Sequence, residues 1–143
     1  MILADTSAWV EYDRGTGSAA DQRIAELIAG DGPLMVTEPV LTEVLAGARN
    51  DEREDDLRRM LLRFGLAPFD AVTDFAAAAR IYRRCRQAGV TPRGMVDCMI
   101  AAVANRVGLA LLAWDADMFR VAEVVGIELD EASLREGRSE EHT

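Results

Sequence analysis

The first twelve residues, "MILADTSAWVEY" (1–12), contain a short apolar segment that is followed directly by the carboxylate of Asp5, and this pattern decides the fold. Residues 2–4 have the hydrophobicity of a buried strand, and Asp5 follows them directly. Asp5 has two possible roles here. Asp, Thr and Ser are good helix caps, so Asp5 could cap a short helix predicted over 7–12. Alternatively, Asp5 is one corner of a site at the end of the strand.

An alternation of short apolar strands and helices continues along the chain. Strands are predicted at 34–36, 66–69, 109–114 and 127–129, and helices at 22–29, 37–49, 51–64, 73–88, 93–107 and 116–125. This alternation predicts an α/β fold with a central parallel sheet and helices on both faces. Ligands of such sheets bind beyond the carboxyl ends of the strands, which is where Asp5 lies.

Composition limits the function. The 143 residues suffice for one domain with a substantial core, and half of them are hydrophobic. All 16 basic residues are arginine, so the chain lacks the lysine that a P-loop or a two-component receiver domain requires. The only histidine, His142, lies in a polar stretch, which argues against a Ser-His-Asp triad or an imidazole zinc site. The net charge of −9 alone argues against a nucleic-acid partner.

The sequence also predicts where the protein resides. No apolar run approaches the roughly 20 residues of a membrane span, and the N-terminus lacks the pattern of a secretory signal. Cys85 and Cys98 lie in helical patterns without metal-ligand partners at useful spacing, so we expect free thiols. We therefore expect a cytoplasmic protein with no membrane association.

Asp97 is the most informative acid. Its neighbours at helical spacing include Gly94, Ile100, Ala101 and Ala104, which predicts that Asp97 faces the buried side of its helix. A buried carboxylate is costly unless it is paired or bound to a metal. A salt bridge to an arginine, or a favourable place at the helix N-terminus, would also explain it. We expect Asp97 to be the most buried of the candidate site acids.

Geometry brings further acids to the same edge. The helix from Asp97 to residue 108 descends about 16 Å, and the strand up to Asp115 returns about 20 Å. Asp97, Asp115 and Asp5 should therefore share one sheet edge, with Asp117 two residues further along the chain. Glu43, a turn and a half into the helix after the second strand, is the fourth candidate. Such a cluster of oxygen ligands without His or Cys favours Mg²⁺, with Mn²⁺ possible, and suits phosphodiester hydrolysis.

Four motifs together resemble the PIN-domain family, specifically the VapC-type ribonuclease toxins of bacterial type II toxin–antitoxin systems. They are "ADTSAWVEY" around Asp5, "TEVLAG" around Glu43, "VDCMIAAVA" around Asp97 and "LLAWDADMF" around Asp115. The resemblance implies a PIN-like α/β/α sandwich with a central parallel sheet, extending to about residue 129. On this basis we expect a PIN domain over 1–133 and a polar, disordered tail over 134–143.

The resemblance also implies a function. It implies Mg²⁺-dependent cleavage of RNA by catalytic Asp5, Glu43, Asp97 and Asp115, with Asp5, Asp97, Asp115 and Asp117 as metal ligands. The relative roles of Asp115 and Asp117 stay open, because Met118 stands where the family usually has phenylalanine, although Asp115 is preferred. Thr6 or Ser7 would orient the first carboxylate or a water on the metal.

The resemblance implies partners as well: a homodimer, and a cognate VapB-type antitoxin that blocks the groove. Local arginines could contact RNA phosphates, and the candidates are Arg14, Arg80, Arg83, Arg84, Arg86 and Arg93. Arg93 is preferred because it precedes Asp97 by one turn, and most of the arginines at 80–86 are expected on a solvated helix face. Two alternatives remain: a PIN nuclease of RNA processing, and a non-catalytic PIN scaffold that only binds a partner.

Overall fold

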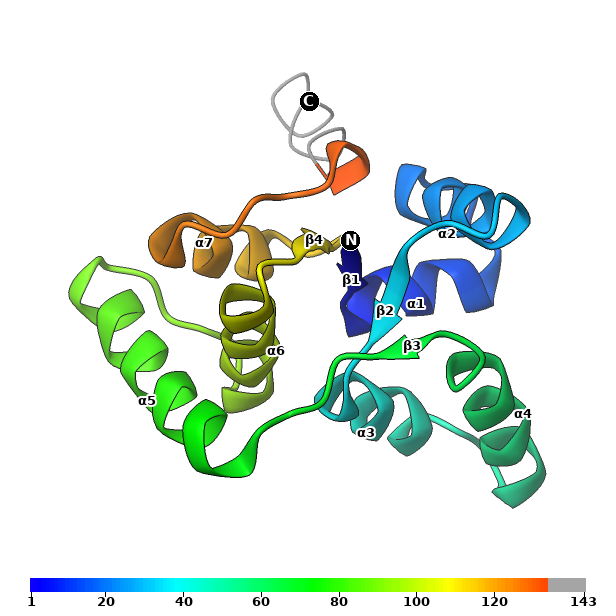
Figure 1. Cartoon of the computed structure of the whole chain (residues 1–143), viewed down its shortest axis with the longest axis horizontal. Helices are drawn as coiled ribbons and strands as arrows, with labels where there is room; N and C mark the ends of the chain where they lie inside the picture. The colour runs from blue at the N-terminus through cyan, green and yellow to red at the C-terminus, as the bar shows by residue number, and fades with distance from the viewer. Residues whose placement is uncertain (134–143) are drawn as a thin grey trace.

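The structure is a computed structural model that describes residues 1–133 of the chain. Strands and helices alternate along these residues, as predicted (Figure 1). The strands are β1 (Ile2–Ala4), β2 (Leu34–Val36), β3 (Gly65–Leu66) and β4 (Ala110–Leu112). The helices are α1 (Thr6–Arg14), α2 (Ala19–Ala29), α3 (Glu38–Ala46), α4 (Asp51–Leu61), α5 (Ala71–Gln87), α6 (Met95–Val107) and α7 (Ala116–Val125).

The strands form one parallel sheet in the order β3-β2-β1-β4. Leu3 of β1 is paired with Met35 of β2 on one side and with Leu111 of β4 on the other. Because the strands are parallel, the carboxyl ends of β1, β2 and β4 meet at one edge of the sheet. The α/β fold with a central parallel sheet is therefore confirmed.

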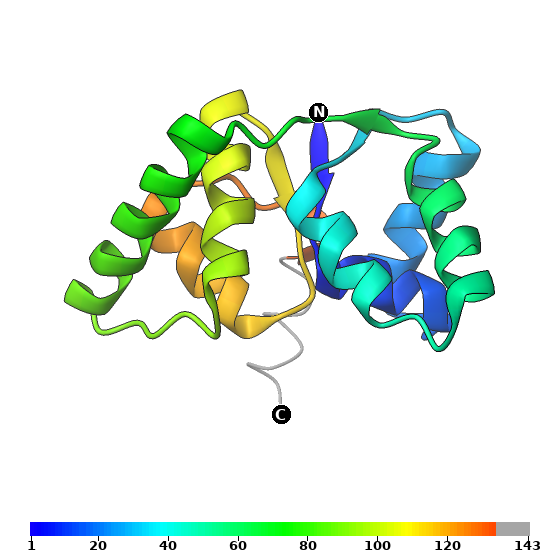
Figure 2. The same ribbon diagram turned by 90° about the horizontal axis from the view of Figure 1, so that it is seen from below.

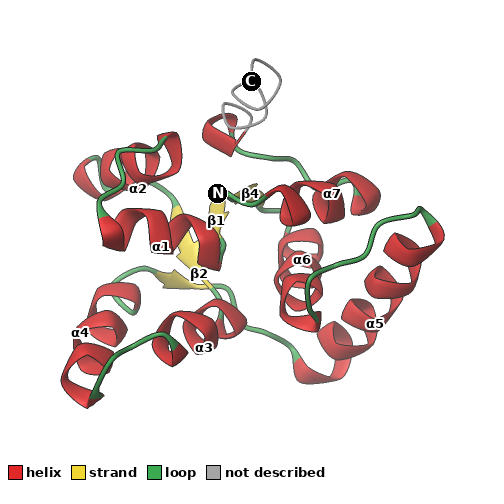
Figure 3. Ribbon diagram, turned by 180° about the vertical axis from the view of Figure 1, so that it is seen from behind, coloured by secondary structure: helices red, strands yellow, loops and turns green. Residues whose placement is uncertain are grey.

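Helices cover the sheet and explain why its strands are apolar throughout. Figure 2 shows α5, α6 and α7 (green to orange) on one side and α1 to α4 (blue to teal) on the other, and Figure 3 shows the helices around the short sheet from behind. All three residues of β1 are buried, as expected for a strand with both faces covered. The largest fully buried side chains include Trp9, Leu3, Ile24 and Leu61.

The turn between α6 and β4 sets the position of the last acids. Gly108 follows α6 with φ of 77°, a left-handed conformation that favours glycine, and its N–H donates to the Ala104 carbonyl. The chain reverses at this point and enters β4. The descent along α6 is thus followed by an ascent along β4, as the sequence predicts.

Three predicted strands are shorter than expected. The strand predicted over 66–69 ends at Leu66, because Pro68 cannot donate a hydrogen bond and the Phe69 N–H donates to the Glu38 carboxylate. The strand predicted over 109–114 covers only Ala110–Leu112. The strand predicted over 127–129 is a single parallel bridge between Leu129 and Leu111.

The remaining expectations about the chain concern its thiols, its termini and membranes. Cys85 and Cys98 are buried free thiols, as predicted. The predicted tail over 134–143 lies outside the described residues. Between residues 1 and 133, no helix is both long enough and apolar enough to cross a membrane.

Candidate active site

Asp5 lies where β1 ends and α1 begins, and it fills both of the roles that its place in the sequence allows. Its Oδ1 accepts a hydrogen bond from the Ala8 N–H at 3.0 Å, so it caps α1. Its carboxylate is also held by Ser7, whose Oγ donates to Oδ1 at 2.7 Å. The Ser7 Oγ in turn accepts from the Trp114 N–H at 2.8 Å, which joins the ends of β1 and β4. Asp5 is only 3% exposed.

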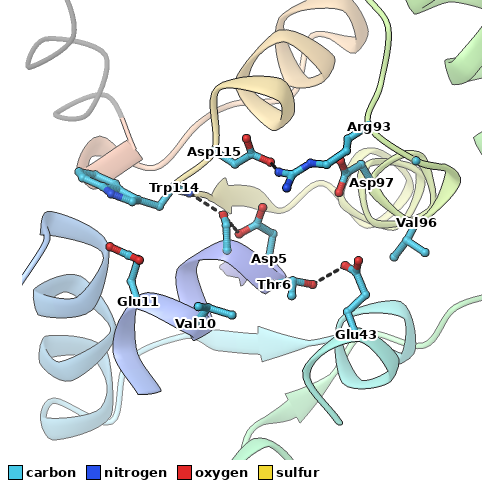
Figure 4. Close-up of a pocket in the computed structure, with 12 residues that line it drawn as sticks. Asp5, Thr6, Val10, Glu11, Glu43, Arg93, Val96, Asp97, Trp114 and Asp115 are labelled. Atoms are coloured by element: carbon cyan, nitrogen blue, oxygen red, sulfur yellow. Dashed lines mark hydrogen bonds and ion pairs between the residues drawn. The ribbon is translucent and has the colours of Figure 1, made fainter. Parts of the chain in front are cut away.

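Glu43 reaches the same region from α3, which begins directly after β2. Its Oε1 accepts a hydrogen bond from Thr6 Oγ1 at 2.6 Å (Figure 4). Thr6 and Ser7 therefore hold two different carboxylates. Of the two hydroxyls proposed to orient Asp5, Ser7 contacts it and Thr6 contacts Glu43.

Asp97 is less buried than expected. It is half-buried, whereas Asp5 is nearly fully buried, so the prediction that Asp97 is the most buried acid is wrong. The reason is that α6 begins at Met95 rather than at residue 93, which places Asp97 in the first turn, at the open end of the helix. This is also a favourable place for a carboxylate in the field of the helix dipole.

Asp115 and Asp117 occupy different environments. Asp115 caps α7 by accepting from the Asp117 N–H at 3.1 Å, and its side chain is 18% exposed, against 37% for Asp117. The Arg93 guanidinium pairs with Asp115, and its Nε lies 3.7 Å from Asp117 Oδ2. Asp117 pairs as well with Arg120 at 3.1 Å. Asp115 thus lies further inside the site than Asp117.

A cavity of about 460 Å³ opens between these carboxylates. Asp5, Glu43, Asp97 and Asp115 all line it, together with Thr6, Ser7, Val10, Glu11, Arg93, Gly94, Val96 and Trp114 (Figure 4). The cavity brings together the four acids predicted to share this edge, whereas Asp117 is not among the residues that line it. Glu11 and Trp114 are not among the residues predicted from the sequence, although Glu11 follows Ser7 by four residues and so shares its helix face.

The electrostatics of the cavity are unfavourable for isolated carboxylates. Burial raises the pKa of Asp5 to about 7, with a further contribution from repulsion by Asp97 and Asp115, although the hydrogen bonds from Ser7 and Ala8 oppose it. Burial likewise raises the pKa of Asp97 to about 6, helped by repulsion from Glu43 and Asp115 and opposed by Arg93. The site therefore holds more acids than the single guanidinium of Arg93 can compensate.

The donor set fits a hard divalent cation in chemistry and in charge. The side-chain oxygens that line the cavity belong to carboxylates and hydroxyls, the ligands that Mg²⁺ and Mn²⁺ prefer, and no histidine or cysteine suited to zinc is among the described lining residues. A cation would also relieve the repulsion that raises the pKa values of Asp5 and Asp97. Across residues 1–133, however, no three acidic, histidine or cysteine side chains are gathered closely enough to form a finished metal site.

Comparisons with known proteins agree with this arrangement. The PIN domain family model matches residues 2–124. The chain is 40% identical over 129 residues to ribonuclease VapC11 of Mycobacterium tuberculosis strain H37Rv and to VapC ribonuclease Mb1587 of Mycobacterium bovis, covering 90% of this chain and 96% of each relative.

A solved structure shares the fold. The crystal structure of VapBC2 from Rickettsia felis, bound to a DNA fragment from its promoter, contains a chain that superimposes with a TM-score of 0.71 at 19% identity, covering 91% of this chain and 98% of that one. The sheet order, the carboxylates at its edge and the match over residues 2–124 lead to one conclusion: the protein belongs to the PIN-domain family, among relatives of the VapC type.

Proposed function

We propose that this protein is a Mg²⁺-dependent endoribonuclease and the toxin component of a type II toxin–antitoxin system. The observation that carries the proposal is the convergence of Asp5, Glu43, Asp97 and Asp115, from four separate elements, on one cavity at the carboxyl edge of the sheet. The relatives that are 40% identical are named VapC ribonucleases, which supports RNA as the substrate.

Each side chain has a specific task in this proposal. Asp5, Asp97 and Asp115 would hold the ion, with Asp117 at the rim as a further ligand. When bound, Mg²⁺ or Mn²⁺ would activate water and stabilise charge developing on the phosphate. Glu43, fixed by Thr6, would accept a proton from the attacking water. Ser7 would keep the Asp5 carboxylate in one orientation through its hydrogen bond.

Arg93 lies at the mouth of the site, with its side chain 65% exposed. Its guanidinium is suited to contact a substrate phosphate beside the carboxylates. Its pairing with Asp115 also supports a means of inhibition, because it places a guanidinium against an acid of this cavity. A cognate VapB-type antitoxin could inhibit the cytoplasmic toxin by inserting an arginine in the same way, and we propose a homodimer as the assembled state.

Purified protein incubated with total RNA tests the proposal. We expect discrete cleavage products with Mg²⁺ or Mn²⁺ and none after exhaustive chelation with EDTA, and sequencing of the new ends would identify the site. Cleavage that survives chelation would contradict the metal-dependent mechanism. Co-expression with the neighbouring small gene should give a stable complex and restore growth, and separate elution of the two proteins would contradict the antitoxin partnership.

A further inference from the structure

A second cavity lies next to the catalytic one and is lined by residues of α1, α3 and α4 and of the segment between α3 and α4. Its volume is about 490 Å³. It shares Val10 and Glu43 with the first cavity, so the two are adjacent. The other side chains that matter for its chemistry are Trp9, Asp13, Arg14, Arg49 and Arg53.

The charge of this second cavity is opposite in character to that of the first. Three arginines line it, against the carboxylates of Asp13 and Glu43. Asp13 is paired with Arg53, and Glu43 accepts the hydrogen bond from Thr6. The catalytic cavity, in contrast, has Arg93 alone among five acids. In a chain of net charge −9, a cationic cavity beside the acidic one is a local exception.

Two of the three guanidinium groups have no counter-ion among residues 1–133. Arg14 and Arg49 are exposed, and their side chains form no ion pair or hydrogen bond with any residue in the described part of the chain. Both therefore keep all their donors for a ligand. Guanidinium groups of this kind bind phosphate oxygens through two parallel hydrogen bonds.

Trp9 forms part of the wall of this cavity. It is 1% exposed, and its indole Nε1 is buried without a hydrogen-bond partner among residues 1–133. Buried polar atoms normally have a partner, so an unsatisfied donor in a residue of this wall is unusual. Because Nε1 is itself buried, it is not accessible to a ligand in the cavity, and Trp9 serves here as a wall residue.

Helix α1 runs from one cavity to the other. Thr6 and Ser7 line the catalytic cavity, and Asp13 and Arg14 line the second. At about 1.5 Å per residue, Arg14 lies roughly 13 Å along the helix from Asp5. A polyanion whose reacting phosphate sits beside Asp5 would therefore extend over α1 toward Arg14 and Arg49.

We propose that the cavity lined by Arg14, Arg49 and Trp9 is a second binding site for the RNA strand, which holds phosphates beyond the one that is cut. The identity of the ligand as RNA rests on the proposed function. RNA is favoured over an acidic protein segment because the site continues directly from the cavity in which a phosphodiester would react. The two unpaired arginines supply the positive charge that the catalytic cavity lacks.

Fluorescence anisotropy with a short fluorescein-labelled single-stranded RNA of mixed sequence tests this, in EDTA so that no cleavage occurs. We expect the double variant Arg14→Ala/Arg49→Ala to bind at least about tenfold more weakly. We expect the slope of log K against log salt to fall by about 1.4, which corresponds to two phosphate contacts on a single strand. The double variant Arg14→Lys/Arg49→Lys should retain most of the slope.

The matched control is Arg83→Ala/Arg84→Ala, which removes the same charge from exposed positions on α5 and should leave affinity and slope close to the wild type. An equal loss in this control, or wild-type protein without salt-dependent affinity, would overturn the proposal. So would an unchanged affinity of Arg14→Ala/Arg49→Ala together with loss of the antitoxin complex, because the cavity would then bind protein.

The experiments distinguish a failure of this second binding site from a failure of the proposed ribonuclease function. If the wild-type protein cleaves total RNA with Mg²⁺ while Arg14→Ala/Arg49→Ala binds RNA normally, the second binding site is ruled out and the proposed ribonuclease activity stands. If RNA binding depends on Arg14 and Arg49 but the protein cleaves no RNA, the proposed activity is ruled out and the second binding site stands. Thermal melting of each variant establishes that it is folded before its affinity is compared.

Discussion

Asp5 and Asp74 are both buried aspartates, but their charges are compensated in opposite ways. Asp5 at the sheet edge is 3% exposed and Asp74 on α5 is 0% exposed. Asp74 accepts hydrogen bonds from Arg106 Nε at 2.9 Å and Nη2 at 2.9 Å, and from the Asp70 N–H at 2.8 Å. Asp5 accepts from Ser7 and Ala8, and its charged neighbours are other acids.

The pKa values record this difference. Burial acts to raise the pKa of Asp74, but the hydrogen bonds from Arg106 and Asp70 and the charge of Arg106 hold it below its ordinary value. For Asp5, burial prevails and the pKa rises to about 7. Asp74 is the carboxylate of a structural ion pair between α5 and α6. The unpaired Asp5 is better explained by a positively charged ligand than by stability.

The largest expected effect is on catalysis. Asp5→Asn keeps the shape and the cap of α1 but removes a proposed metal ligand, so we expect RNA cleavage to fall at least about a thousandfold. Asp97→Asn should behave in the same way. Asp74→Asn should leave the rate per folded molecule within about twofold of the wild type. Single-turnover cleavage of a mapped RNA site measures all three, and an Asp74→Asn variant as inactive as Asp5→Asn would contradict the comparison.

The second prediction concerns the free energy of unfolding. Asp74→Asn should lower it by about 2 kcal/mol, less than a fully buried pair would lose, because the Arg106 side chain is 35% exposed and stays solvated. Asp5→Asn should not destabilise the metal-free protein, since it removes an unfavourable buried charge. Urea titration of both variants in EDTA measures this, and a reversed order of stability would mean that Asp5 is structural.

A smaller effect is expected from the metal itself. At ten times its Kd, Mg²⁺ should stabilise the wild type by about 1.4 kcal/mol, or raise Tm by roughly 3–5 °C. Asp74→Asn should show the same increase from its lower starting Tm. In Asp5→Asn and Asp97→Asn the increase should nearly disappear. Thermal melts with and without Mg²⁺ measure these shifts, with Ca²⁺ and Na⁺ at equal ionic strength as controls.

The smallest effect concerns pH. The folded pKa values of Asp5 and Asp97, about 7 and about 6, lie above those of an unfolded chain, so the folded state binds more protons between about pH 4 and 7. Their contribution to stability is therefore complete below about pH 4 and is lost as the pH rises through 6 and 7. Asp74 contributes with the opposite sign, losing stability as the pH falls.

Denaturant titrations of metal-free protein at several pH values test this difference. Subtracting the Asp5→Asn/Asp97→Asn curve from that of the wild type isolates the contribution of the two acids. The difference should become less favourable to the wild type from pH 5 to pH 7.5. A flat difference would show that these carboxylates are ordinary solvated acids, and the opposite slope would show that the folded state lowers their pKa values.

The sequence predicted much of this arrangement because its signals are local. The strand at 2–4 and the helix at 116–125 agree with the structure, and the lengths of α6 and β4 correctly place Asp97 and Asp115 on one edge. The errors occur where tertiary contacts decide. The depth of Asp97 depends on where α6 begins, and the end of β3 depends on Pro68 and on the bond from Phe69 to Glu38.

The second cavity shows what periodicity could not reveal. The sequence makes Arg14 a candidate for RNA contact, but Arg49 and Arg53 are far from it along the chain and meet it only because α1, α3 and α4 pack together. Pairings such as Arg106 with Asp74, 32 residues apart, are likewise invisible in a helical pattern. They depend on side-chain directions between helices, which the sequence alone does not specify.

The hydrogen bond from the Trp114 N–H to Ser7 Oγ determines when the site can form during protein synthesis. It spans 107 residues, and the Asp5 N–H likewise donates to the Leu112 carbonyl at 2.9 Å, so the first strand gains its last neighbour only from the far end of the chain. Domains form as their residues emerge from the ribosome, and pairings between distant segments form late. The cavity at the sheet edge therefore cannot be completed on a nascent chain until residues up to Asp115 have been translated. Under the proposed function, the nuclease would stay inactive during its own synthesis, and the antitoxin would need to act only on the folded molecule.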